Sequence, residues 1–138
     1  MELAYPKPQK KPRKGLKISK LDALFSKYIR TRDKWTCQRC SKKFTPPTQA
    51  LHCSHYFGRG KKSVRFDPGN ADALCYGCHH YWEKEDREGY RVFKINQLGQ
   101  RGYDLLTLYA MTPQKPDTKL LTIYFTKLLE ELEQKERI

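Results

Sequence analysis

The sequence predicts an α+β protein: a small core held together by metal-binding cysteines, with flanking α-helices and a disordered basic arm at the N-terminus. Two Cys-x2-Cys pairs, Cys37/Cys40 and Cys75/Cys78, frame a segment of 34 residues that contains short strand-like runs. Apolar residues at helical spacing stand before and after the two pairs. The framed segment is therefore expected to have a structure of its own, surrounded by helices.

The chain of 138 residues fits one domain with extensions. We expect a basic arm at 1–18, a domain with flanking helices at 19–112 whose core spans 35–83, and a linker with a C-terminal helix at 113–138. The arm is rich in Pro and Lys, which is typical of disorder. It either neutralises phosphates outside the main footprint or is a solvated terminus.

No stretch of the sequence is apolar for long enough to cross a bilayer, and the first residues carry charges without an apolar signal core. We therefore expect a cytoplasmic protein with no membrane partner. In a reducing compartment, clustered cysteines bind metal more often than they form disulfides.

The first helix is expected to begin after Ser19, because Ser19 and Asp22 have the spacing of a capping box. The residues that follow place an apolar stripe on one helix face over about three turns. The stripe consists of Leu21, Leu24, Phe25, Tyr28 and Ile29.

Between the cysteine pairs the sequence alternates turn signals and short apolar runs. The expected elements are a loop at 45–48, a strand around 50–57, a basic loop at 58–63, a second short strand at 64–66, a turn at 67–70 and a helix from about Leu74.

Beyond the second pair, Asp86 is expected to cap a helix that stops at Gly99, and a short helix is expected at 104–110. The last segment, 116–138, has apolar residues on one face. This helix either folds back onto the domain or forms a homodimer seam, although it is short for a free coiled coil.

The charge of the chain favours a nucleic-acid partner. The net charge is +13; residues 34–66 carry eight Lys or Arg and no acid, whereas twelve of the fifteen acids fall in residues 67–138. A basic half of this kind predicts a polyanion-binding face. The residues expected to contact DNA phosphates are Arg59, Lys61, Lys62 and Arg65. The alternative is a solvated charged hairpin.

The four paired cysteines predict a structural Zn²⁺ site, because two Cys-x2-Cys turns supply the four tetrahedral thiolates that zinc prefers. The fifth cysteine, Cys53, is expected to be a small strand residue. A module of this size is expected to depend on zinc for its fold.

All four histidines lie between positions 52 and 80, inside or next to the framed segment. Hydrolysis of a phosphodiester needs a divalent metal for the leaving oxygen and a base that works near neutral pH, and histidine can serve either purpose. An Asn side chain can orient such a base. The alternative is that these histidines are packing residues of a binding-only zinc module.

The order Cys37-x2-Cys40, Ser54-His55, Asn70-x4-Cys75-x2-Cys78-His79 resembles HNH endonucleases, which have a ββα-metal or treble-clef core. Within this order, the runs His55–Arg59 and Arg65–Asp67 with Asn70 resemble the phage lambda NinG/Rap recombination endonucleases. The spacing is also similar to that of phage resolvases that cut Holliday junctions. The resemblance covers about residues 35–83.

The resemblance implies catalytic roles for three residues: His55 as the general base, Asn70 as the residue that positions the base, and His79 as a ligand of a catalytic Mg²⁺ or Mn²⁺. It also implies a metal-binding residue at position 54, where this chain has Ser54, a poor ligand for such ions. His52, on the same strand face, or His80 would complete the metal site.

The predicted function is therefore metal-dependent DNA cleavage. The family resemblance implies branched recombination intermediates, such as Holliday junctions or D-loops, in a phage or bacterial host cytoplasm. Two symmetric cuts would require a homodimer. The alternatives are a nicking HNH enzyme on ordinary duplex, in phage packaging or defence, and a non-catalytic zinc-finger DNA-binding protein.

Overall fold

The computed structural model describes residues 19–136. The arm expected at 1–18 lies outside the described residues. The helices and strands are α1 (Lys20–Arg32), β1 (Leu51–His55), β2 (Ala71–Cys75), α2 (Tyr76–Lys84), α3 (Arg87–Met111) and α4 (Thr118–Glu136). Two 3-10 turns, η1 (Lys62–Val64) and η2 (Pro68–Asn70), lie between the strands. The predicted α+β class is confirmed.

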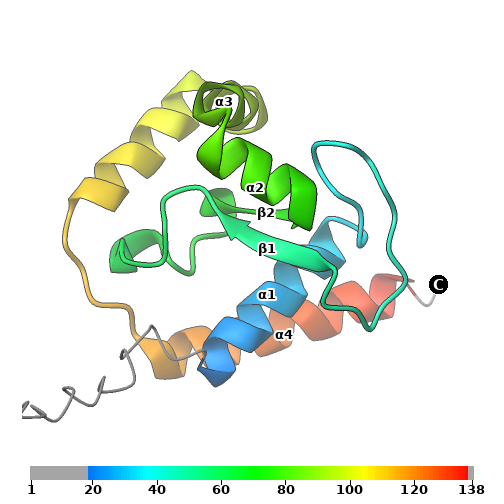
Figure 1. Ribbon diagram of the computed structural model, residues 1–138. Coiled ribbons are helices and arrows are strands. Elements are labelled where there is room, and N and C mark those ends of the chain that lie inside the picture. The colour runs from blue at the N-terminus through cyan, green and yellow to red at the C-terminus, as the bar shows by residue number, and fades with distance from the viewer. Residues whose placement is uncertain (1–18, 137–138) are drawn as a thin grey trace, which may run out of the picture.

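The two strands form an antiparallel hairpin that separates two layers of helices. Leu51 pairs with Cys75 at one end of the hairpin and His55 with Ala71 at the other. Helices α2 and α3 cover one face, while α1, backed by α4, covers the other (Figure 1). Because each strand has one partner among the described residues, none of these residues pairs with the second edge of β1.

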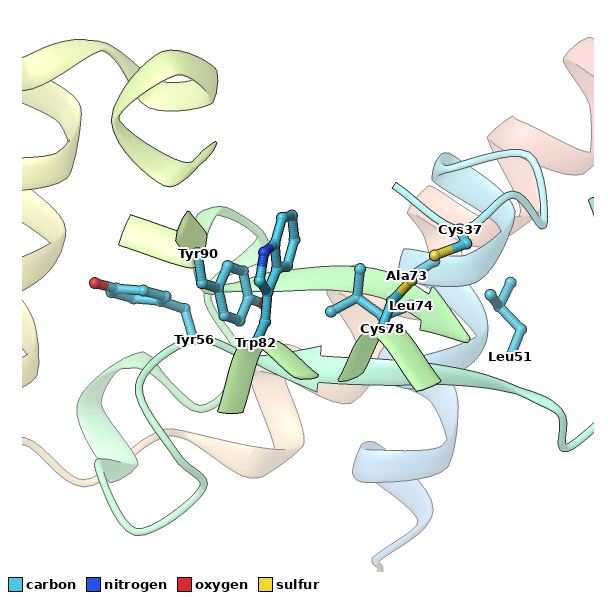
Figure 2. Packing of buried hydrophobic residues seen from close by; sticks show 8 residues of the cluster. All are labelled: Cys37, Leu51, Tyr56, Ala73, Leu74, Cys78, Trp82 and Tyr90. Atoms are coloured by element: carbon cyan, nitrogen blue, oxygen red, sulfur yellow. The ribbon is translucent and has the colours of Figure 1, made fainter. Parts of the chain in front are cut away.

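One hydrophobic core lies between the hairpin and helices α2 and α3 (Figure 2). Its buried members are Cys37, Leu51, Tyr56, Ala73, Leu74, Cys78, Trp82 and Tyr90. The rings of Trp82 and Tyr90 stack with centroids 4.6 Å apart, and Cys37 and Cys78 lie side by side at the other end of the cluster. The cysteine cluster is therefore continuous with the apolar core.

A second core joins α1 and α4 to the opposite face of the hairpin. Phe125 of α4 is buried and packs edge-to-face on Phe25 of α1, with ring centroids 5.1 Å apart. The C-terminal helix therefore folds back onto the domain, as one of the two interpretations predicted. The homodimer stays a prediction.

The ends of α1 and α3 form as their sequences predict. The Ser19 hydroxyl accepts from the Asp22 amide at 3.1 Å, and the Asp22 carboxylate accepts from the Ser19 amide at 2.9 Å. Asp86 accepts from the amide of Gly89 at 2.9 Å at the start of α3. Gly99 breaks α3 with a φ of 76°, so the two helices expected here form one span with a break.

The second strand was predicted at the wrong place. Residues 64–66 do not form a strand; β2 is Ala71–Cys75, directly after the turn. The strand was not predicted because it contains the acidic residue Asp72. In the fold that carboxylate is fully buried, where it accepts from the Lys94 ammonium at 3.0 Å. The following helix begins at Tyr76 rather than at Leu74.

Candidate functional site

The four paired cysteines meet in space. Cys37 and Cys40 lie in a turn closed by the bridge between Thr36 and Lys43, while Cys75 ends β2 and Cys78 lies in the first turn of α2. All four sulfur atoms lie within 4.8 Å of one another. Four thiolates at about 2.3 Å from a tetrahedral zinc ion would be about 3.8 Å apart. The distance between the sulfurs of Cys40 and Cys75 is 3.9 Å.

The surroundings of the cluster suit a metal thiolate site. The guanidinium of Arg39 donates to the Cys78 sulfur at 3.4 Å and lies over the Tyr81 ring, so it partly offsets thiolate charge. Burial alone would raise the pKa of the Cys37 thiol, but backbone amides, those of Cys40 and Cys75 foremost, lower it to about 7. None of the five cysteines forms a disulfide. The cluster is consistent with structural Zn²⁺, and Cys53 lies outside it in β1.

His52 of β1 and His79 of α2 form a second candidate metal site. Their Nδ1 atoms lie 3.1 Å apart. Two nitrogen ligands at about 2.1 Å and at right angles around one metal ion would lie about 3.0 Å apart. Burial, with a smaller contribution from His79, lowers the pKa of His52, which favours the neutral imidazole that metals bind.

Glu83 orients this histidine pair. Its carboxylate accepts from Nε2 of His79 at 3.0 Å, one helical turn further along α2. A carboxylate on the outer nitrogen fixes the tautomer of a metal-binding histidine and leaves the other nitrogen free to bind. Sequence reasoning missed Glu83, although its four-residue spacing from His79 places it on the same helix face. His80 instead stacks on Tyr76.

Ser54 is not available as a ligand, which corrects the expectation at this position. It lies on the same strand face as His52, but it is completely buried. Its hydroxyl lies 3.1 Å from the hydroxyl of Tyr90, which donates to Asp72. The hydroxyl of Ser54 is thus part of a buried polar network and faces no open site.

His55 lies on the other face of β1, against the ring of Phe25. Its Nε2 lies 2.9 Å from the carbonyl oxygen of Arg65. A carbonyl only accepts, so Nε2 carries the proton and Nδ1 keeps its lone pair. Burial first, and then the nearby charge of Arg59, lower the pKa of His55 to about 4. The imidazole is therefore neutral at physiological pH.

The side chain of Asn70 forms no hydrogen bond with His55 but holds the loop that orients it. Its side chain is fully buried and bonded to both backbone groups of Phe57, accepting at 2.8 Å and donating at 2.9 Å. It also donates to the Val64 carbonyl at 3.1 Å. Since the next carbonyl, that of Arg65, accepts from His55, Asn70 can position the base only through the backbone.

Arg65 must be removed from the predicted DNA-contacting set. It is buried and forms a two-pronged ion pair with Asp22, with N–O distances of 2.7 and 2.9 Å. Lys61 and Lys62 are exposed, and Arg59 is partly exposed. Three of the four basic residues that were expected to contact phosphate are therefore at least partly exposed, and their contact with DNA stays a prediction.

A hollow of about 410 Å³ runs along the second edge of β1. It is lined by Asp22, Ala23, Ser26, Arg30, Gln49, Leu51, His52, Cys53, Arg59 and His79. His55 is outside this lining, but it lies close to the charges of Arg59 and Asp22, which belong to it. Side chains from both faces of β1 thus border one groove, because no strand within residues 19–136 closes that edge.

No protein-family model, curated protein or solved structure matches this chain. Within residues 19–136, no helix is both long enough and apolar enough to cross a membrane.

Proposed function

We propose that this protein is a metal-dependent DNA endonuclease of the HNH type that hydrolyses phosphodiesters. The single observation that carries the proposal is the meeting of His52 and His79 in a groove that also contains Arg30 and Arg59. A divalent metal beside guanidinium groups that have no acidic partner within residues 19–136 is the combination that a phosphodiester requires. A binding-only zinc module would need the four cysteines but no second pair of metal-binding nitrogens.

In this proposal, His52 and His79 would hold the catalytic ion, and Glu83 orients His79. The bound ion would stabilise negative charge on the leaving oxygen. Two imidazoles favour a transition metal such as Mn²⁺ over Mg²⁺, because Mg²⁺ prefers oxygen ligands.

His55 is the proposed general base. Its Nδ1 accepts a proton from water, the hydroxide attacks phosphorus, and the bond to the leaving oxygen breaks. The backbone carbonyl of Arg65 holds the ring, and it would favour the positive charge that develops on the imidazole. Asn70 supports this carbonyl through the loop.

The proposed substrate is branched DNA, such as Holliday junctions or D-loops. This part rests on the resemblance to the NinG/Rap endonucleases and on the basic loop, whose Lys61 and Lys62 are exposed. Such contacts follow the DNA backbone and carry no base readout.

A cleavage assay on a four-way junction and on linear duplex of the same sequence tests the proposal. We expect His55→Ala and His79→Ala to lose metal-dependent cleavage while DNA binding is retained. His80→Ala is the matched control, since His80 is the exposed neighbour of His79 and stacks only on Tyr76. Cleavage that survives in both test variants would refute the mechanism, and equal rates on both DNAs would remove the preference for branches.

A further inference from the structure

A second hollow adjoins the groove that contains His52 and His79. It has a volume of about 460 Å³ and is lined by Lys27, Arg30, Trp35, Pro46, Pro47, Thr48 and Gln49. Arg30 and Gln49 line both hollows. A ligand in the first hollow can therefore extend past Arg30 into the second.

Arg30 has no acidic partner among the residues that the structure describes. Its guanidinium donates to backbone carbonyls, that of Thr48 at 2.8 Å and that of Ser26 at 3.3 Å. The acid in the lining of the groove, Asp22, is paired with Arg65. Carbonyl oxygens do not neutralise the guanidinium, so Arg30 keeps a full charge between the two hollows that can attract an anion.

Trp35 is held in place by the way α1 ends. The amide of Lys34 donates to the Thr31 carbonyl at 3.0 Å and that of Trp35 to the Arg30 carbonyl at 2.8 Å, which is the Schellman pattern. Lys34 and Trp35 have φ values of 56° and 53°, a left-handed conformation that usually takes glycine. This energetically costly backbone conformation places the partly exposed indole of Trp35 under the Arg30 guanidinium, with the ring centroid 4.7 Å from Cζ. The indole forms a wall of the second hollow.

We propose that the second hollow binds an unpaired DNA nucleotide beside the cleaved phosphate, with its base against the part of the Trp35 indole that lines the hollow and its phosphate at Arg30. The proposal rests on the proposed function, which puts the cleaved phosphate in the first hollow. A base stacked inside a duplex cannot enter a side hollow, whereas an unpaired base is free to stack on an aromatic ring. This site would give the enzyme a physical reason to prefer branched DNA.

Tryptophan fluorescence tests this binding without any cleavage. The chain has two tryptophans, and Trp82 is buried against Tyr90 while Trp35 is partly exposed. Without added Mg²⁺ or Mn²⁺, we expect a single-stranded thymidine oligonucleotide to quench the fluorescence and a blunt duplex of equal charge to leave it unchanged. In Trp35→Phe the quenching should vanish. Quenching that persists in this variant, or equal quenching by both DNAs, would overturn the proposal.

Affinity measured by fluorescence anisotropy gives a second readout. We expect Trp35→Leu to bind the single strand about tenfold more weakly and the duplex unchanged, and Trp35→Phe to retain most of the affinity. Circular dichroism and zinc content establish that each variant is folded. An unchanged affinity in folded Trp35→Leu would contradict the proposal, and if this variant does not fold, the quenching comparison decides.

The two proposals can fail separately. If cleavage depends on His55 but no DNA quenches Trp35, the nucleotide site is refuted and the nuclease stands. If the single strand quenches Trp35 specifically but no metal supports cleavage, the nucleotide-binding hollow stands and the nuclease proposal fails.

Discussion

The Nδ1 atoms of His52 and His79 lie 3.1 Å apart, although 27 positions separate the two residues in the chain. The contact exists because His52 faces α2 from the hairpin and His79 lies in the first turn of that helix, next to the cysteine that anchors it. The pairing of β1 with β2 and the start of α2 directly after β2 therefore bring the two histidines together.

Glu83→Gln should weaken binding of Mn²⁺ to the histidine pair by about 10- to 100-fold. The reason is that a neutral amide replaces the charged carboxylate that accepts from Nε2 of His79. Isothermal titration calorimetry on zinc-loaded protein measures this affinity. Glu85→Gln, at an exposed position two residues further on, should leave it unchanged. Equal affinities in the wild type and Glu83→Gln would show that the carboxylate has no part in the site.

Cys75→Ser should abolish both stoichiometric zinc and the folded state, because zinc binding contributes directly to the folding of small modules. Metal analysis and far-UV circular dichroism report the two losses. The matched control is Cys53→Ala, which removes a buried thiol outside the cluster and should keep one zinc per chain. Loss of zinc from the control as well would contradict the assignment of the four ligands.

Asn70→Ala should lower the free energy of unfolding by about 2–3 kcal/mol, because it leaves buried backbone groups of Phe57 and Val64 without partners. Urea denaturation measures the change. Cleavage should fall too, through loss of the loop that orients His55. An Asn70→Ala protein with normal stability but no activity would instead point to direct contact of Asn70 with the substrate.

Stability should fall as the pH is lowered from about 6.5 to about 4. An unfolded histidine has a pKa of about 6.5, whereas burial lowers that of His55 to about 4, so in this window the unfolded chain binds more protons. The contribution of His55 to the free energy of unfolding is complete above about pH 6.5 and is lost as the pH falls to about 4. His55→Gln should therefore show a shallower loss than wild type in denaturation at several pH values, while His80→Gln should follow the wild type.

The salt dependence of DNA binding should distinguish the exposed from the buried basic residues. Lys61→Gln should reduce the slope of log affinity against log salt concentration by about 1, since one phosphate contact is lost. Arg65→Gln should leave the slope unchanged and instead destabilise the fold, because it leaves Asp22 buried without its partner. A reduced slope in folded Arg65→Gln would place Arg65 back on the DNA-binding face.

Local signals predicted much of the fold. The capping residues Ser19 and Asp86 and the break at Gly99 act through hydrogen bonds and backbone angles within a few residues, and all three were found where expected. The strand at 71–75 was missed because Asp72 is polar, and its cost of burial is offset by Lys94, which lies 22 residues away. No local pattern can reveal such a partner.

The sequence by itself determined that four cysteines at metal-binding spacing would meet, and that histidines would gather near them, because short Cys-x2-Cys turns present their ligands regardless of the rest of the chain. Only the tertiary structure decided which polar residues face the open groove. Ser54 and Arg65 are buried, whereas Arg30 and Glu83, which carry no motif, are placed beside the histidines. Burial and the pairing of charges depend on contacts between distant elements, so they appear only once the chain has folded.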